Sequence, residues 1–277
     1  MNTLASLILA ISTATGSVGT NASADDSYQS LIDTRSESIV TVKFVMNVSM
    51  GGGGGMDREI PIEIGGLVVS EDGLIMIPGG PMDLANQMRR QMRGRRGGRG
   101  GGGGGGMADM EIEATPSDIR VVMGEDFDEY DAVLAAKDST LQLAFVMLED
   151  ASELELTPLE LAPTTDPRIG EELLTLARLG EEYDYAPYFA KVQVTGRVDQ
   201  PRRMWCIGTQ MFSPGLPVFS SAGVFVGIMG NGVSGGDDQG MMGGQSAFPF
   251  LVPVKQIAPI VKQALDRGRE LLVEEDG

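Results

Sequence analysis

The sequence predicts an all-β protein of sandwich or barrel type that ends in one α-helix. Short runs of alternating or continuous apolar residues recur along the 277-residue chain, as they do in strands. Its 39 glycines and 14 prolines are numerous enough to supply a turn between successive runs. The last stretch, Lys255 to Leu272, instead repeats its apolar residues at helical spacing. These observations favour a chain of many short strands closed by a helix.

The first half of the chain contains strand-like runs separated by turn signals. A short helix or arm, Asp25 to Ser36, leads into them. Gly65-Gly66 separates two of the runs, and Asp72-Gly73 is typical of a hairpin turn. The predicted strands are Ser38 to Val48, two runs within Glu59 to Val69, Leu74 to Ile77, Glu111 to Met123, Asp131 to Ala136 and Leu141 to Leu148.

A low-complexity insertion, Met82 to Met107, interrupts this first half. Its beginning, Asp83 to Met92, is predicted to be helical, whereas Arg93 to Gly106 contains only arginine and glycine and is predicted to be disordered. One interpretation is an arm that binds polyanions; the other, which we favour, is a solvated insertion or one that contacts the protein's own acidic surface. The arginines concerned are Arg89, Arg90, Arg93, Arg95, Arg96 and Arg99.

The second half begins after an acidic, proline-containing stretch, Glu149 to Asp166, where we place the boundary between residues 25–150 and 151–254. A helix and tail, residues 255–277, follow the last strand. Pro259 is expected in the first turn of this helix, where proline is tolerated. The predicted strands are Arg168 to Ala177, Lys191 to Val198, Met204 to Thr209, Val224 to Ile228 and Phe248 to Pro253.

The net charge and the N-terminal residues indicate which partners and which cellular location to expect. A net charge of −18 disfavours general binding to nucleic acid or anionic membranes. Residues 1–24 are predicted to be a signal peptide, with an apolar region at Leu4 to Ile11 and a cleavage site at Ala22-Ser23-Ala24. We therefore expect a secreted, periplasmic or cell-envelope protein. No apolar run is long enough for a transmembrane helix.

The stretch Ser213 to Ile228 reads S-P-G-L-P-V-F-S-S-A-G-V-F-V-G-I. It resembles the active-site loop of trypsin-like serine proteases, and most of all that of the HtrA/Deg branch. Gly65 to Met76 resembles the family's strand before the catalytic histidine, and Asp138 to Val146 resembles the segment that holds the aspartate. The resemblance covers roughly Ser38 to Leu265. It implies two six-stranded antiparallel β-barrels packed together, with a closing C-terminal helix. Because the sequence ends after this helix, we expect no PDZ domain.

The residues of the catalytic triad are replaced at every position of this resemblance. The histidine position falls on Gly80 and the aspartate position on Gln142. The serine position falls on Pro214, or is deleted if Ser213-Pro214-Gly215 is aligned with the family's N-P-G. The chain contains no histidine, so a Ser-His-Asp triad is excluded. We therefore predict a proteolytically inactive domain.

The predicted function is peptide or protein binding in the cleft between the two barrels. The candidate wall of the cleft is the last strand, to which a bound peptide would add as a further strand. Relatives of the HtrA type often form trimers, so the resemblance makes a homo-oligomer possible. No cofactor and no metal site are predicted, because the acidic cluster around Glu129 lacks EF-hand spacing. The candidate binding residues are Phe248, Pro249, Phe250, Leu251 and Val252.

Two alternatives belong to other classes of protein. The first is an active hydrolase with a relocated site, in which Ser213, Ser220 or Ser221 is activated by Lys191 or Lys255. The second is a polyanion-binding protein that acts through the arginine–glycine insertion, whose binding would weaken steeply with salt.

Overall fold

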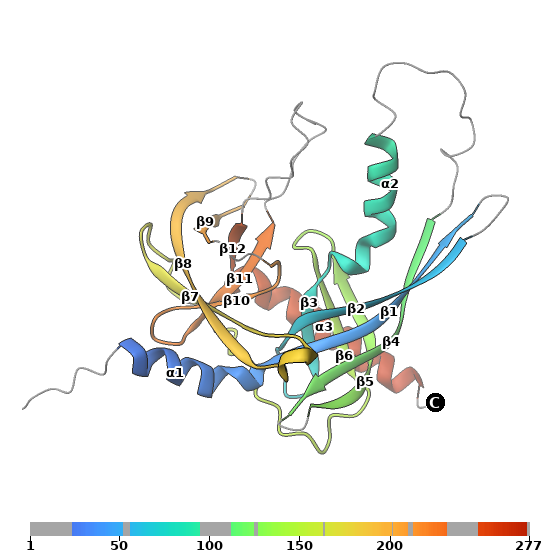
Figure 1. Cartoon of the computed structure of the whole chain (residues 1–277), viewed down its shortest axis with the longest axis horizontal. Helices are drawn as coiled ribbons and strands as arrows, with labels where there is room; N and C mark the ends of the chain where they lie inside the picture. Colours follow the sequence, from blue (N-terminus) through green and yellow to red (C-terminus); the bar gives the residue numbers. More distant parts are fainter. Residues whose placement is uncertain are drawn as a thin grey trace, which may run out of the picture.

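Two closed barrels make up most of the molecule. In a computed structural model the described residues are 24–51, 56–94, 112–124, 127–162, 164–200, 202–209, 213–231 and 249–275. Each barrel has six antiparallel strands, and the barrels lie side by side (Figure 1). The predicted all-β class with a C-terminal helix is confirmed, and the two barrels fit a trypsin-like double-barrel fold.

The two barrels share one strand order. In each ring the strands follow the order first, second, third, sixth, fifth, fourth, after which the fourth pairs back with the first. The first barrel contains β1 (Ile39–Met50), β2 (Met56–Val68), β3 (Leu74–Pro78), β4 (Ile112–Met123), β5 (Asp128–Asp138) and β6 (Leu143–Leu148). The second contains β7 (Glu172–Arg178), β8 (Pro187–Val198), β9 (Met204–Gly208), β10 (Pro217–Phe219), β11 (Phe225–Asn231) and β12 (Pro249–Pro253).

Strand β2 corrects one prediction. The sequence predicted two runs separated at Gly65-Gly66, but β2 continues through both glycines, which pair with Thr41 and Val40 of β1. A Cβ atom on Gly66 would lie 2.9 Å from the side chain of Ile75 on β3. The glycine therefore allows the neighbouring strands to approach closely instead of starting a turn.

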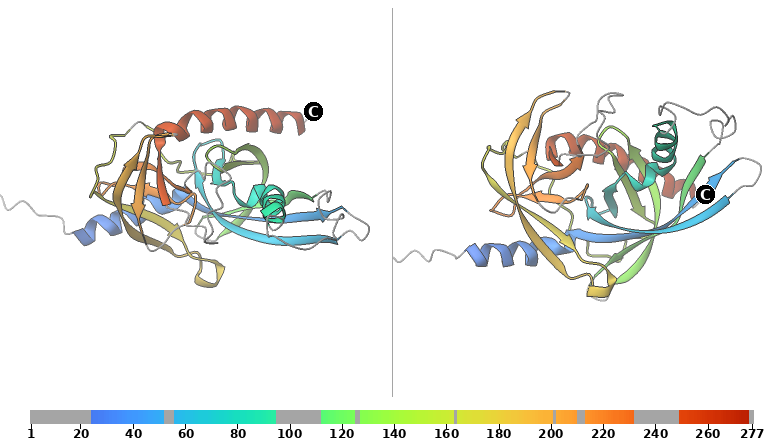
Figure 2. Two further views of the ribbon diagram at one scale, coloured as in Figure 1. Left: turned by 90° about the horizontal axis from the view of Figure 1, so that it is seen from above. Right: turned by 45° about the horizontal axis from the view of Figure 1, so that its top comes forward.

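Strands β1, β2 and β4 extend beyond the barrel as a three-stranded ribbon (Figures 1 and 2). Pro61 of β2 pairs with Val45, and Pro116 of β4 pairs with Met46. Because proline has no N–H, both are non-hydrogen-bonded pairs, and each proline nitrogen faces the outer edge of the ribbon. A proline therefore interrupts the row of donors on each edge, which is a known protection against pairing with other chains.

Helix α2 (Leu84–Gly94) covers one face of this ribbon. Leu84, Ala85 and Met88 pack against the cluster that contains the buried residues Phe44 and Met46. A short 3₁₀ turn, Pro81–Asp83, connects the helix to β3. The predicted helix at the start of the insertion is confirmed, although its bounds differ by one or two residues.

Three apolar clusters explain why many strands are apolar on both faces. One cluster fills each barrel, and the largest lies between the barrels. On β6, Val146 belongs to the first-barrel cluster, whereas its neighbour Phe145 belongs to the cluster between the barrels, and both are fully buried. Leu174 and Phe219 reach the same inter-barrel cluster from the second barrel. The barrels are therefore joined by a common core.

Helix α3 (Val254–Glu275) starts at the end of β12 and crosses onto the first barrel (Figure 2). Its buried residues Ile257, Val261 and Ala264 complete the inter-barrel cluster. Pro259 corrects a prediction, since it is the sixth residue of the helix and lies in its second turn. Its nitrogen cannot donate to the carbonyl of Lys255, so one intrahelical hydrogen bond is lost.

Helix α1 (Ala24–Arg35) packs against the second barrel. Leu31 is buried, and the ring of Tyr28 stacks on that of Phe189 with 4.9 Å between centroids. The predicted signal peptide lies outside the described residues except for Ala24, the first residue of α1. No helix among the described residues is both long and apolar enough to cross a membrane.

Candidate functional site

The three positions aligned with the catalytic triad meet at the junction of the barrels. The amide of Gly79 donates to the carbonyl of Gln142 across 2.7 Å. A Cβ atom on Gly215 would lie 2.7 Å from Cγ of Pro78, so the loop before β10 contacts the end of β3. Gly80 and Pro214 are the direct neighbours of these contact residues. The segments that come together therefore belong to both barrels.

None of the three side chains at this junction provides a nucleophile or a base. Gly80 has no side chain, and its carbonyl accepts a hydrogen bond from Nε2 of Gln87 across 2.6 Å. Gln142 is exposed and has a left-handed backbone with φ of 55°. Pro214 is half-buried and carries only its ring. An amide and a pyrrolidine ring neither attack a carbonyl nor accept a proton near neutral pH.

The backbone N–H groups at the same junction already donate hydrogen bonds to other carbonyls. Pro214 has no N–H, and the amide of Gly215 donates to the carbonyl of Met229 across 2.8 Å. The amide of Leu216 points back to the carbonyl of Ser213 across 3.4 Å. An oxyanion hole requires free N–H groups that converge on one point. The N–H groups of Gly215 and Leu216 are not available for that purpose.

The predicted peptide-binding strand needs a correction. Phe250 and Leu251 of β12 pair with β11 on one side and with β9 on the other. Leu251 and Val252 are buried, and Pro249 and Phe250 are half-buried; Phe248 lies outside the described residues. A strand inside a closed barrel has no free edge where it is paired on both sides. A peptide strand therefore cannot pair with Phe250 and Leu251.

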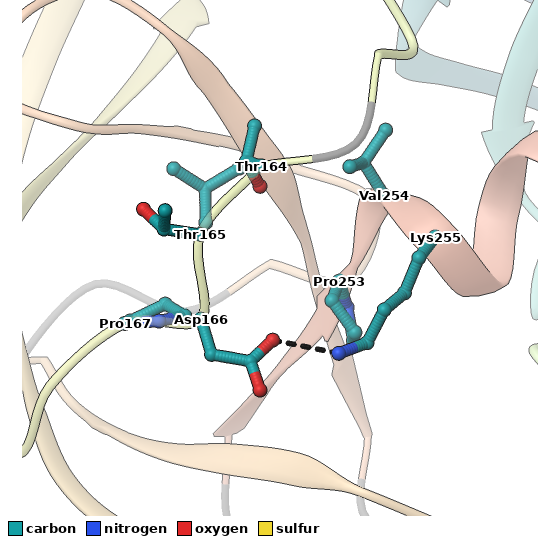
Figure 3. A pocket seen from close by; sticks show the side chains of 8 residues that line it. Thr164, Thr165, Asp166, Pro167, Pro253, Val254 and Lys255 are labelled. Atoms are coloured by element: carbon teal, nitrogen blue, oxygen red, sulfur yellow. Dashed lines mark hydrogen bonds and ion pairs between the residues drawn. The ribbon is translucent and has the colours of Figure 1, made fainter.

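Both candidate lysines of a relocated site are bound to carboxylates. Nζ of Lys255 lies 2.6 Å from Asp166, in a narrow crevice between the inter-barrel linker and the start of α3 (Figure 3). Nζ of Lys191 lies 3.1 Å from Glu172. Among the described residues, neither lysine forms a hydrogen bond with a serine.

The three candidate serines lie in turns on either side of β10. Ser213 and Ser221 are exposed, and Ser220 is half-buried. The hydroxyl oxygen of Ser220 accepts from the amide of Val224 across 3.3 Å, inside the turn before β11.

Of the six predicted arm residues, the structure places the side chain of Arg89 alone. Nη2 of Arg89 donates to the carbonyl of Ile112 across 2.6 Å and thereby links α2 to β4. Arg90 and Arg93 lie in α2, but their side chains are outside the described part. Arg95, Arg96 and Arg99 also lie outside it. Arg89 thus has a structural role.

The sequence analysis missed a groove on the ribbon face opposite α2. It has a volume of about 340 Å³ and is bounded by β1, β2, β4 and β5 and by the 3₁₀ turn after β7. Lys43 stands directly opposite Glu63 on β2 and Arg120 on β4. The alternation of β1 places Lys43 on the polar face, but sequence gives no sign of which residues face it across the ribbon.

Glu129 holds the two cations of the groove together. Its carboxylate lies 3.0 Å from Nζ of Lys43 and 3.1 Å from Nη1 of Arg120. These hydrogen bonds, that of Lys43 first, lower the pKa of Glu129 below its usual range. Without this carboxylate two like charges would face each other on neighbouring strands, which is unfavourable.

Arg178, at the end of β7, connects the two barrels. Its guanidinium donates to the carbonyls of Ser36 and Ile39, which lead into the first barrel, and to that of Tyr185 in the second. The distances are 2.8, 2.6 and 3.1 Å respectively. Burial lowers the pKa of this guanidinium, which remains charged.

The fold and the junction together define the class of this protein. Two barrels of the same strand order, with a common core and a junction of three loops between them, fit a trypsin-like double barrel. Comparison with known protein families finds no family model that matches the chain, and comparison with curated proteins finds no match either.

Proposed function

We propose that this protein is a proteolytically inactive, trypsin-like binding module that resembles the HtrA/Deg branch. One observation carries the proposal: the loops that would form the active site converge, but their key positions are Gly80, Gln142 and Pro214. A junction of converging loops without reactive side chains is better suited to binding a polypeptide than to cleaving it. The predicted signal peptide supports export as part of the same proposal.

The edge of β11 is the place where we propose that a peptide binds. Met229 already exchanges backbone hydrogen bonds with Gly215 and Leu216 before β10. Because strand residues alternate, the backbone N–H and C=O of Asn231 face the same side as those of Met229. Among the described residues, β12 is the only strand paired with Asn231, on its other side. An extended peptide can therefore continue this edge by strand addition.

The absence of an activated serine nucleophile is tested by labelling residues 25–277 with a fluorophosphonate and measuring the intact mass. This reagent reacts with activated serines, so we expect no adduct. An adduct would contradict the proposal, and mapping the modified serine would locate a relocated site.

Peptide binding at β11 is tested with fluorescein-labelled casein, an unfolded protein, and fluorescence anisotropy. Asn231→Pro removes the N–H that would bond the peptide, and should weaken binding about tenfold. The control is Glu160→Pro in the exposed linker. Equal binding by both variants, or no binding by the unmodified protein, would count against the β11 edge.

Polyanion binding is a second candidate. It is supported by the arginine-rich composition of the insertion and weakened by the contact of Arg89 with Ile112. It predicts heparin binding that decreases steeply with salt and disappears when residues 93–106 are deleted. Binding that survives this deletion would exclude it.

A further inference from the structure

We propose that the groove beneath the ribbon docks the arginine–glycine segment, residues 93–106, of a second copy of this chain. The inference concerns self-association and is independent of the proposed function. It rests on the shape of the groove, on its unbalanced charge and on the position of the segment relative to the ribbon. The groove spans both barrels, since its lining includes Glu181 from the second barrel.

The groove is lined by both apolar and charged residues. Val45 and Pro61, a directly opposed pair on β1 and β2, supply apolar atoms. Carboxylates also line it, among them Glu63 and Glu181. Such a surface suits an arginine side chain, whose methylene stem lies along apolar atoms while its guanidinium reaches a carboxylate.

The charges around the groove do not balance. Four carboxylates and two cations line it, so two negative charges are in excess. Lys43 and Arg120 are paired with Glu129, Glu181 and Asp118. Glu63 forms no ion pair with any described residue. A cationic ligand would therefore meet a carboxylate that has no ion-pair partner among the described residues.

The arginine–glycine segment is the complementary part of the chain. Residues 93–106 contain four arginines and no acidic residue, in a protein of net charge −18. All the other residues of the segment are glycines, so no other bulky side chain prevents entry into a groove of about 340 Å³. The charge complementarity favours this segment as the occupant.

The occupant belongs to a second copy because the described residues on either side of the segment lie on the face of the ribbon opposite the groove. Helix α2, which leads into the segment, packs on the face that carries Phe44 and Met46. The groove lies on the other face, with Lys43 and Val45. The segment returns at Ile112, which is buried among the same residues that α2 covers. Both of its ends are therefore held on the face away from its own groove.

Docking of this kind is heterologous, since a groove on one copy receives a segment from another. It generates rings or open chains of copies rather than one obligatory dimer. Two variants separate the partners: Glu63→Lys cancels the two excess negative charges of the groove, and Arg95→Gln with Arg96→Gln and Arg99→Gln removes three of the four arginines in residues 93–106. Neither change touches a buried residue of the described chain.

Sedimentation velocity of the 25–277 chain tests the proposal. We expect the unmodified protein to associate at about 50 mM salt, and the association constant to fall about tenfold at about 500 mM because exposed charges are screened. Each variant alone should remain monomeric. An equimolar mixture of the two should form a complex that stops at the heterodimer, because one groove and one segment remain intact.

Glu59→Lys is the matched control, since Glu59 is exposed on the same face of β2 but does not line the groove. It should associate like the unmodified protein. The proposal is overturned if the unmodified protein is monomeric at low salt, if Glu59→Lys and Glu63→Lys behave alike, or if the mixture fails to form a heterodimer. If the segment docks within its own chain instead, the unmodified protein will be monomeric at low salt, which is the first of these outcomes.

Discussion

At the scale of single residues, two glycines allow the loops at the junction to approach closely, Gly79 within the first barrel and Gly215 between the two barrels. A Cβ atom on Gly79 would lie 2.8 Å from the backbone of Gln142, and one on Gly215 would meet Pro78 at 2.7 Å. Gly215 also has φ of +85°, a conformation that other residues adopt at a cost. The junction therefore depends on the absence of side chains at Gly79 and Gly215, which are the direct neighbours of Gly80 and Pro214.

Replacing Gly215 by alanine is expected to destabilise the protein by about 2 kcal/mol, because the methyl group overlaps Pro78 and the left-handed backbone is strained. Urea unfolding measures the change. Gly65→Ala is the control, since a Cβ atom there has no neighbour within 4 Å. Equal effects of the two substitutions would show that the barrels do not meet at Gly215.

Glu129 should contribute a pH-dependent part of the stability. Lys43 and Arg120 lower the pKa of its carboxyl, so the folded state binds a proton less readily than the unfolded chain. The contribution is present above the unfolded pKa, about 4.3, and is lost as the pH falls through the folded value. Glu129→Gln should therefore lower the melting temperature at neutral pH more than at about pH 3.

Glu63→Gln is the control for this measurement, since Glu63 lines the same groove without forming an ion pair among the described residues. If the difference between Glu129→Gln and the unmodified protein does not shrink on acidification, the carboxylate does not stabilise the pair of cations.

At the scale of elements, the ribbon of β2, β1 and β4 shows how two exposed edges are protected. Strand β2 pairs with β3 only at Leu67 and Val68, and β4 pairs with β5 only from Arg120 to Met123. The outer parts of both strands have no other partner among the described strands. Pro61 and Pro116 stand in these outer parts, where their missing N–H groups interrupt each edge.

Replacing Pro61 and Pro116 by threonine should therefore increase association through the edges of the ribbon. Each substitution restores an outward N–H and introduces a residue that favours strands. We expect faster aggregation at the melting temperature, measured by light scattering. Asn47→Thr in the central strand β1 is the control, because its backbone is paired on both sides. Unchanged aggregation of the double variant would contradict this role of the prolines.

At the scale of the whole molecule, the barrels behave as one body because their largest core is shared. The cluster between them contains residues from α1, from both barrels and from α3. Arg178 adds a polar connection by donating to three carbonyls on the two sides. We therefore expect a single cooperative unfolding transition.

Arg178→Met should lower the free energy of unfolding by about 3 kcal/mol, because it leaves the carbonyls of Ser36, Ile39 and Tyr185 without these donors. Fluorescence of Trp205 reports the second barrel, and circular dichroism reports both. The control is Arg58→Met, at an exposed arginine without a described partner. Separate transitions by the two methods would show that the barrels unfold independently.

The sequence by itself determined the fold class and most of the strands. Alternation in β1 and continuous apolar runs in β3 and β6 are local patterns, and the order of the motifs was enough to suggest two barrels. The residues Gly80, Gln142 and Pro214 at the positions that the resemblance aligns with a triad were also visible, because the identity of a residue needs no structure. The prediction of two separate strands where the structure has β2 was wrong. The sequence alone does not distinguish a glycine pair in a turn from one that lets neighbouring strands approach closely.

Only the tertiary structure decided which surfaces are open. β12 was predicted to be a binding edge, but closure of the barrel pairs Phe250 and Leu251 on both sides. The groove and the connection through Arg178 join residues as far apart as Lys43 and Glu181. The local sequence pattern determines to which face of its strand a side chain points. Register, barrel closure and packing determine which residues that side chain contacts. These three features depend on contacts between distant parts of the chain, which local patterns do not reveal.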